Sequence, residues 1–307
     1  MRGALTLRPS YYEALRRLTL QLAGVRMGSD HAFLVETRLA NLARREGYAS
    51  LDAMVEELFS SGQARLAVQV VSSLVERDTH FNHDPTSLDT LFDIALRDLA
   101  QKRGGGRLDL LCHGCGSGQD AYSVAMRALS QQGRDVLGPT ELHIIGVDYP
   151  SQALERARAG RYTHFEVQRG LSARDMVSYF TPDPAPNSTD WLASDALRAH
   201  VSFQDMHLMS DRMDKDRFHI VLFRGALGQY TNSARIRLMR GLSLCLKPYG
   251  YLVLGSDEEV GGEAFGLEAV DGAPGLYRKP EVEVAPVGKQ PTGRTTFDGA
   301  KKRVRRA

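Results

Sequence analysis

The sequence is poor in cysteine and tryptophan and has no long apolar run. It holds three cysteines and one tryptophan in 307 residues, and an odd, small number of thiols cannot build the disulfide framework of a small secreted domain. No window reaches the roughly 18 consecutive apolar residues that a membrane-spanning helix needs, and the first residues lack the apolar centre of a secretory signal. We therefore expect a globular cytoplasmic protein with no membrane insertion.

Charge is balanced over the whole chain but not along it. The net charge is +2, yet the last twenty residues alone hold seven basic side chains and one acidic side chain, so the rest is mildly acidic. An acidic body offers no face for nucleic acid, and no nucleic-acid partner is expected. Residues 286–307 lack apolar periodicity and are predicted to form a disordered basic tail. This tail is either a solvated terminus or an electrostatic tether to an acidic partner.

The spacing of apolar residues changes near residue 100. Upstream, apolar side chains recur at helical intervals, as over residues 51–58, and predict a small all-α domain over residues 1–100. Ser50 and Ser87 each precede such a run and are candidate N-caps. A run of basic residues and glycines at 102–106 then breaks the helical pattern.

Short apolar segments follow this break and alternate with stretches that can form helices. That alternation is typical of a Rossmann-like α/β domain, in which helices cover both faces of a parallel sheet. We expect this domain over residues 101–285, with an inserted subdomain at about 161–203. The segments predicted to be strands are 108–112, 142–147, 219–223 and 251–254, with a shorter candidate at 199–203.

A glycine-rich turn follows the first of these strands and leads into a helix expected to begin near Gln119. Glycines stand at 114, 116 and 118, where they allow a tight turn and a close approach of the backbone to a ligand. A dinucleotide-binding fingerprint would place a glycine at 119 instead. The observed spacing fits the amino-acid part of S-adenosylmethionine (SAM) in a Rossmann-like methyltransferase.

The second predicted strand ends in an acidic residue, Asp148. A carboxylate at the carboxyl edge of such a sheet can accept hydrogen bonds from both hydroxyls of a ribose. The alternative is that Asp148 caps the helix that follows. A helix, a Lys-Pro-x-Gly turn and a strand near the end of the domain also commonly close the sheet of methyltransferases. The cofactor predicted from these features is SAM, with S-adenosylhomocysteine (SAH) as its product.

Longer segments carry a more specific pattern. GCGSGQDAYSVAM is similar to the signature G-C-S-T-G-E-E-P-Y-S, VDYPSQALERARAGRY to D-I-D-x-x-x-L-x-x-A-R-x-G-x-Y, and FHIVLFRGALGQY to F-D-h-I-h-C-R-N-V-h-I-Y-F. These signatures belong to the chemotaxis receptor methyltransferases, the CheR family, which the chain resembles over about residues 15–280. The resemblance implies a class I SAM-dependent methyltransferase domain behind a small all-α domain. It also implies methyl transfer to glutamate side chains of a chemoreceptor.

Carried over position by position, the resemblance implies a set of site residues. Catalytic positions are His83, Arg224 and Gln229. No metal is expected, because the pair Cys112 and Cys115 has no second pair to complete a zinc site. The cofactor contacts are Arg77, Thr79, His83, Gly114, Gly116, Gly118, Gln119, Asp120, Asp148, His207, Leu208, Arg224 and Gly225.

Several reactive positions depart from the family's pattern. His83 stands where the family has arginine, Gly225 where it has asparagine and Gln229 where it has tyrosine. Arginine is permanently charged and forked, whereas histidine is a cation only when protonated and glutamine has no phenol. Two alternatives stay open: an active protein-glutamate methyltransferase, and a catalytically impaired scaffold or sensor that binds SAM or SAH.

The N-terminal helical domain also carries a basic helix. Arg38, Arg44 and Arg45 are spaced six and seven residues apart, which puts them near one helical face. The resemblance implies that such a helix meets the cytoplasmic helices of a chemoreceptor. The alternative is a solvated helix face, because exposed charge pairs contribute little.

Overall fold

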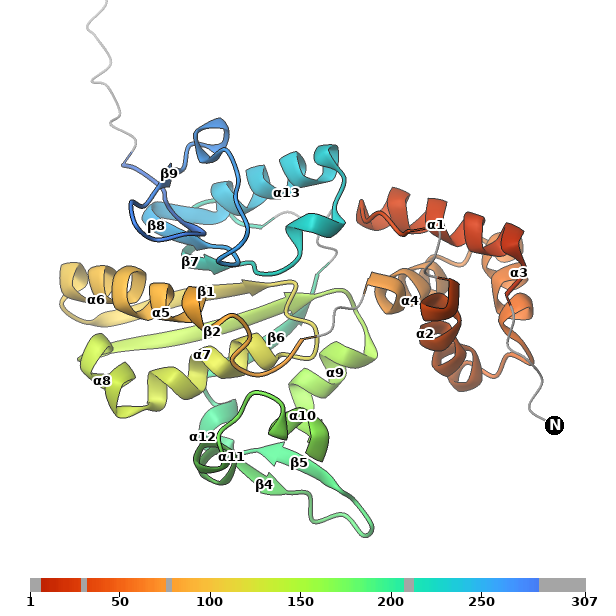
Figure 1. Cartoon of the computed structure of the whole chain (residues 1–307), viewed down its shortest axis with the longest axis horizontal. Helices are drawn as coiled ribbons and strands as arrows, with labels where there is room; N and C mark the ends of the chain where they lie inside the picture. Colours follow the sequence, from red (N-terminus) through yellow and green to blue (C-terminus); the bar gives the residue numbers. More distant parts are fainter. Residues whose placement is uncertain (1–6, 29–31, 76–78, 207–212, 282–307) are drawn as a thin grey trace, which may run out of the picture.

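The computed structural model describes residues 7–28, 32–75, 79–206 and 213–281. They form a helical part and a larger α/β part that lie side by side (Figure 1). The predicted basic tail, 286–307, lies outside the described residues. Within the described ranges, no helix combines the length and the apolar character that crossing a membrane requires.

The helical part is built from α1 (Pro9–Ala23), α2 (Ala32–Arg45), α3 (Leu51–Ser61) and α4 (Ala64–Val75). Each helix presents one apolar face, and these faces meet in a core where Leu15, Leu39 and Met54 are fully buried. The predicted cap Ser50 is confirmed, since its side chain accepts a hydrogen bond of 3.1 Å from the backbone N–H of Ala53.

Three further helical segments pack on the sheet of the α/β part. They are α5 (Pro85–Thr90), the π-helix η1 (Leu91–Leu96) and α6 (Arg97–Arg103). Leu88, Phe92 and Leu96 share one core with the strands. The packing therefore divides the two parts ahead of residue 79, whereas the helical pattern led to a boundary at residue 100. Periodicity marks a helix without identifying the core on which it packs.

The start of α5 differs from the prediction. Its N-cap is Asp84, whose side chain accepts a hydrogen bond of 3.3 Å from the backbone N–H of Ser87. Pro85 follows at the first helical position, which proline favours because its φ is already helical. The predicted cap Ser87 is thus wrong: this residue lies inside the first turn.

The main sheet has seven strands in the described residues, and its order confirms the Rossmann-like fold class. The strands β6, β2, β1, β7 and β8 pair in parallel, and β10 pairs antiparallel with both β8 and β9. Each of the five predicted strands overlaps an observed one. In spatial order the strands are β6 (Val201–Asp205), β2 (Thr140–Asp148), β1 (Gly106–His113), β7 (Phe218–Leu222), β8 (Leu246–Val253), β10 (Leu276–Arg278) and β9 (Glu268–Ala269).

Alternate side chains of the central strands enter two different cores. Leu110 of β1 faces one core and Leu111 the other, as the period of two in a strand requires. The first core includes residues of α7 (Gln119–Leu129), α8 (Gln131–Leu137) and α9 (Gln152–Ala159). The second includes residues of α13 (Asn232–Cys245) and of the short helices η2 (Leu227–Gln229) and η3 (Gly262–Phe265). The sheet is therefore covered on both faces.

A small antiparallel sheet lies within the predicted insertion and projects from the main sheet (Figure 1). Its last expected strand belongs elsewhere, because β6 is an edge strand of the main sheet. The insertion thus ends before Val201. Its elements are β3 (Arg161–Thr163), α10 (His164–Gln168), α11 (Ala173–Tyr179), β4 (Phe180–Pro182), β5 (Asp190–Ala193) and α12 (Asp195–Arg198).

Candidate functional site

The turn between β1 and α7 carries the first two predicted glycines in a left-handed conformation. The φ angle is 68° at Gly114 and 55° at Gly116, a region that strains any residue with a Cβ. A Cβ on Gly116 would meet only the side chain of Thr79, at an ordinary contact distance of 3.8 Å. Glycine at 116 is therefore explained by its backbone conformation, and its contact with a ligand stays a prediction.

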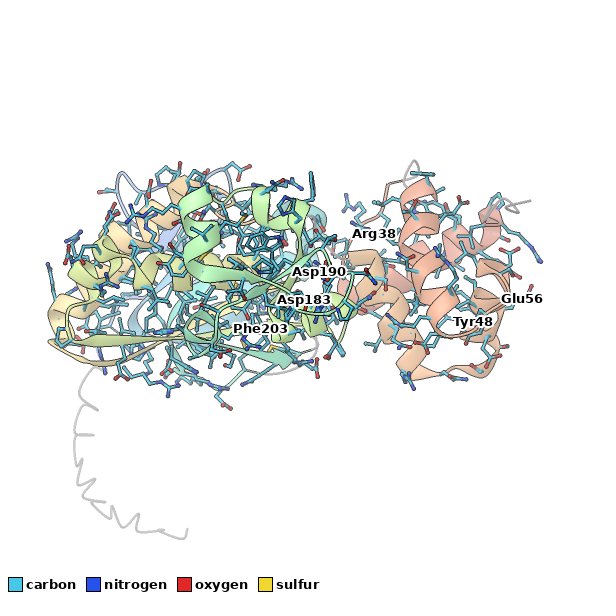
Figure 2. All side chains as sticks on the ribbon, turned by 90° about the horizontal axis from the view of Figure 1, so that it is seen from below. Arg38, Tyr48, Glu56, Asp183, Asp190 and Phe203 are labelled. Atoms are coloured by element: carbon cyan, nitrogen blue, oxygen red, sulfur yellow. The ribbon has the colours of Figure 1, made fainter. Side chains whose placement is uncertain are left out.

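The third glycine of the turn serves a different purpose. A Cβ on Gly118, whose φ is 83°, would lie 2.8 Å from Ala157 Cβ and 2.8 Å from Phe203 Cζ. The same ring of Phe203, labelled in Figure 2, lies against Gly146 of β2. Gly118 is therefore required for the close packing of α7 against α9 and β6, and its missing side chain opens no space for a ligand.

Asp148 ends β2 and is hydrogen bonded to the glycine turn. Its Oδ2 accepts a bond of 2.6 Å from the backbone N–H of Gly116, and its Oδ1 accepts one of 2.7 Å from the N–H of Tyr149. The helix that follows, α9, is capped by Ser151, whose side chain accepts from the N–H of Leu154. The alternative role of Asp148 as a helix cap is therefore wrong.

Asp148 and the glycine turn line one pocket. It is walled from both parts of the chain, because residues of the helical part complete it. We call it the cofactor pocket; its lining residues are Val25, Ser72, Val75, Gly114, Gly116, Asp148, Tyr149, Ser151, Ala153, Gln229 and Tyr230.

The donor set of this pocket fits SAM. The two oxygens of a carboxylate are acceptors that can take hydrogen bonds from ribose hydroxyls, and Asp148 places a carboxylate on the pocket wall. Gly114 and Gly116 add backbone without a Cβ to the same wall. The pocket also meets the first residues after β1 and β2, at the carboxyl edge where ligands of such sheets bind. Three of the predicted cofactor contacts, Gly114, Gly116 and Asp148, are thus brought together.

A polar cluster lies behind the turn. Gln119 is buried, and its Oε1 accepts hydrogen bonds from the hydroxyls of Thr79 and of Ser117, the latter at 2.7 Å. Thr79 and Gln119, both predicted cofactor contacts, therefore contact each other. Their bonds tie residue 79, which precedes α5, to the start of α7.

Arg224 follows β7 and is fully enclosed by protein. Its Nη1 donates to the carbonyl oxygen of His83 at 2.7 Å, to that of Asp84 at 3.1 Å and to Ser87 Oγ at 2.7 Å. Its Nη2 forms an ion pair of 2.6 Å with Asp120 Oδ1, and its side chain is 0% exposed. The guanidinium thus clamps three segments together. Arg224 and Asp120, predicted as cofactor contacts, form this clamp.

The remaining reactive positions lie around the clamp. His83 and Gly225 are neighbours, since a Cβ on Gly225 would lie 3.4 Å from His83 Cε1. Gln229 lines the cofactor pocket. We call residues 79–87 and 224–229 the reactive edge. Arg77, His207 and Leu208, also predicted as cofactor contacts, lie outside the described residues.

Tyr162, on β3 of the insertion, supports the glycine turn between β1 and α7, and the sequence analysis did not identify it. Its buried hydroxyl donates a hydrogen bond of 2.7 Å to the carbonyl oxygen of Ser117. Burial raises the pKa of the Tyr162 phenol well above 10.0, so it remains a donor over the working pH range. The tyrosine is visible in the motif that ends in G-R-Y, but the motif does not tell what it contacts.

Sequence reasoning also missed an acidic residue, Glu258, in the turn after β8. Its carboxylate accepts hydrogen bonds from three backbone amides, two of which belong to the reactive edge. The sequence does not show the link to the reactive edge, because the two partners there lie 31 and 33 positions away.

The predicted basic helix, α2, faces a long groove. The groove has a volume of about 2020 Å³ with its open solvent and is bounded by α2, α4 and the start of α9. Arg38 and Arg45 line it together with Arg65, but Arg44 does not. In Figure 2, Arg38 lies on the side of the helical part toward the sheet, and Tyr48 and Glu56 lie on the side away from it. We call this the arginine groove.

Comparison with known proteins agrees with the motif reading. Residues 77–273 match the family model of the CheR methyltransferase SAM-binding domain. The chain is 27% identical to the chemotaxis protein methyltransferase Cher2 of Pseudomonas putida, over 86% of this chain and 96% of that protein. It is 27% identical to chemotaxis protein methyltransferase 1 of Pseudomonas aeruginosa, over 87% and 97%. A chemotaxis protein methyltransferase of Vibrio parahaemolyticus is 25% identical over 90% and 98%.

Proposed function

This chain belongs to the CheR methyltransferase family, and on that premise we propose that it methylates glutamate side chains of a chemoreceptor with SAM. Family membership makes it a SAM-dependent methyltransferase of the chemotaxis type. The observation that carries the proposal is the cofactor pocket, where the glycine turn and Asp148 meet a wall from the helical part. A pocket walled in this way can hold a cofactor next to a docked protein.

The proposed roles divide between the two sides of the site. Gly114 and Gly116 receive the amino-acid end of SAM, and Asp148 binds its ribose. When bound, SAM supplies an electrophilic methyl group on a sulfonium, which the acceptor carboxylate takes as a methyl ester while SAH leaves with the electron pair. Glutamate is ionised near pH 7, so no general base is needed. His83, Gly225 and Gln229 of the reactive edge align the acceptor and exclude water, while the enclosed Arg224 holds their segments in place. Alignment and desolvation supply the acceleration.

The proposed protein partner is a cytoplasmic chemoreceptor helix, which places the chain in the cytoplasm. Acidic side chains of such a helix complement Arg38, Arg45 and Arg65 in the arginine groove. The groove shares Ser72 and Ser151 with the cofactor pocket, so a helix in the groove would present its side chains to the methyl group. Arg44 is outside the groove. Within it, Arg45 and Arg65 pair with Glu46 at 3.3 and 3.5 Å, so an acidic partner helix would compete with this carboxylate.

The second candidate is a SAM- or SAH-binding scaffold that does not turn over. The substitutions at His83, Gly225 and Gln229 favour it, because they remove a permanent cation and a phenol from the reactive edge. Titration calorimetry with SAM and SAH, followed by transfer of tritiated methyl to receptor-containing membranes, separates the two. Tritium that is incorporated into receptor and released by base as methanol would support the methyltransferase. Binding of SAM or SAH without any incorporated tritium would support the scaffold instead.

The role of Asp148 can be tested with a matched control. Asp148→Asn should weaken SAH binding by about 1 to 3 kcal/mol through lost charge-assisted hydrogen bonds, while its remaining oxygen can still accept from the N–H of Gly116. The control is Asp205→Asn, because Asp205 ends the adjacent strand β6 in register with Asp148 and pairs with Arg158. Equal affinities for both variants would refute the ribose assignment.

A further inference from the structure

The turn after β8 is joined to the reactive edge by one carboxylate. Glu258 Oε2 accepts hydrogen bonds from the N–H of Gly225 at 2.8 Å and of Gly255 at 2.9 Å. Its Oε1 accepts one from the N–H of Leu227 at 2.8 Å. Three amides on one carboxylate are charge-assisted bonds, which are stronger than neutral ones. They link the loops that follow two neighbouring strands, β7 and β8.

The local sequence is adapted to this arrangement. A Cβ on Gly255 would lie 3.0 Å from Glu258 Oε2 and 3.1 Å from Asp257 Oδ1. Glycine at this position therefore lets the carboxylate approach the backbone of its own turn. Gly225, at the other end of the link, has a φ of 63° and holds the left-handed conformation that brings its N–H to Glu258.

The same turn also holds the other half of the reactive edge. Ser256 donates to Asp84 from its backbone N–H at 2.7 Å and from its hydroxyl at 2.8 Å. Asp84 is itself left-handed, with a φ of 45°, a conformation that persists only where surrounding contacts impose it. Residues 255–258 thus hold two segments in place, the one that carries His83 and the one that carries Gly225.

We propose that Glu258 is a positioning residue for methyl transfer, acting through the loop from Gly225 to Gln229. Glu258 does not line the cofactor pocket, so it contributes through the placement of Gln229 and of Gly225 beside His83. This inference rests on the proposed function for its kinetic consequence. The structural link itself is independent of turnover.

The kinetic test uses Glu258→Gln and Glu258→Ala, with the exposed neighbour Glu259→Gln as matched control. Because a misplaced reacting group can cost about 100-fold in rate, Glu258→Ala should lower kcat roughly 10- to 100-fold and change the Kd of SAH less than about threefold. Glu258→Gln keeps one acceptor oxygen and should recover part of the loss. A fall in SAH affinity as large as the fall in kcat, or an unchanged kcat in both variants, would overturn the positioning role.

Hydrogen exchange supplies a readout that does not depend on activity. In the full-length protein with SAH, exchange of the peptide that spans residues 223–230 should rise in Glu258→Ala and stay at the wild-type level in Glu259→Gln. Unchanged exchange in Glu258→Ala would overturn the proposal whatever the kinetics. Absence of methyl transfer by the wild type, with exchange raised as expected, would instead count against the proposed function. If Glu258→Ala does not fold, Glu258→Gln decides both measurements.

Discussion

The two sides of the site are held together in different ways. On the cofactor side, the backbone of the glycine turn makes the pocket, and Asp148 fixes it with a bond to the N–H of Gly116. On the reactive edge, side chains do this work: Arg224 bonds to residues 83, 84 and 87, and Glu258 bonds to residues 225 and 227. The cofactor side depends on the backbone conformation of one turn and a single carboxylate bonded to it, and the reactive edge on a network of several charged side chains.

This difference bears on how the reactive edge can vary. Three of the positions that depart from the family's pattern, His83, Gly225 and Gln229, lie on the reactive edge; others, such as Gln119 and Asp120, lie at the start of α7. The placement of the first three is imposed by Arg224, Asp84 and Glu258, none of which depends on their side chains. The reactive edge can therefore change its chemistry while its geometry stays fixed, which is why both the enzyme and the scaffold proposals are compatible with one fold.

The largest effect is expected where the network is broken at its centre. Arg224→Met keeps the volume of a long side chain but leaves Asp120, whose side chain is 15% exposed, without its ion-pair partner. Breaking a buried pair in this way costs about 3 to 5 kcal/mol. Urea unfolding of the purified protein measures the loss. Because Arg224 belongs to one segment of the reactive edge and bonds to the other, amide hydrogen exchange should also rise at residues 83–87 and beside residue 224.

A matched control exists at the other end of the sheet. Arg107 forms an ion pair of 2.7 Å with Asp109, but its side chain is 56% exposed. Arg107→Met should cost less than about 1 kcal/mol, as exposed pairs do. Similar losses for Arg224→Met and Arg107→Met would show that the buried network contributes no more than a surface pair.

A smaller and more local effect is expected on the cofactor side. Gly118→Ala should cost about 2 to 4 kcal/mol, because a left-handed alanine is strained by about 1 to 2 kcal/mol and its Cβ overlaps Ala157 and Phe203. Gly104→Ala is the control, since Gly104 has a φ of 65° with no atom within 4 Å of a Cβ. Thermal unfolding should show only the strain cost in Gly104→Ala. Equal shifts in both variants would mean that the packing of Phe203 is not what requires Gly118.

The same contrast explains what the sequence could predict. The strands, the glycine turn and the acid at the end of β2 follow from local patterns, because side-chain periodicity and glycine conformation are properties of neighbouring residues. The cap of α5 was also accessible, since Asp84 stands directly before Pro85. Choosing Ser87 instead overlooked the proline at the first helical position.

The reactive edge could not be derived in this way. The partners of Arg224 lie 104 to 141 residues away, and only the fold brings them together. The resemblance marked Arg224 and His83 as reactive positions, but it did not tell that the arginine binds the carbonyl of the histidine. The packing of α5 and α6 on the sheet was missed for the same reason, because an amphipathic helix can cover either core.

Acid should weaken the reactive edge through one identified group. Burial raises the pKa of Asp84, but hydrogen bonds from Ser256 and Ser87 outweigh this and hold the pKa below 3.8. A carboxyl group with a lowered folded-state pKa stabilises the fold above its unfolded-state pKa, and this contribution is lost as pH falls through the folded-state value. The loss should therefore begin below about pH 4.

Comparison of the wild type with Asp84→Asn isolates this contribution, because asparagine also tolerates the left-handed conformation at this position but does not titrate. The wild type should be the more stable protein at pH 7, and the gap in unfolding free energy should narrow as the pH is lowered from 4 to 3. Asp214→Asn is the control for replacing an aspartate, since the Asp214 side chain is 81% exposed. A gap in unfolding free energy for Asp84→Asn that stays constant down to pH 3 would mean that the bonds from Ser256 do not depend on the charge of Asp84.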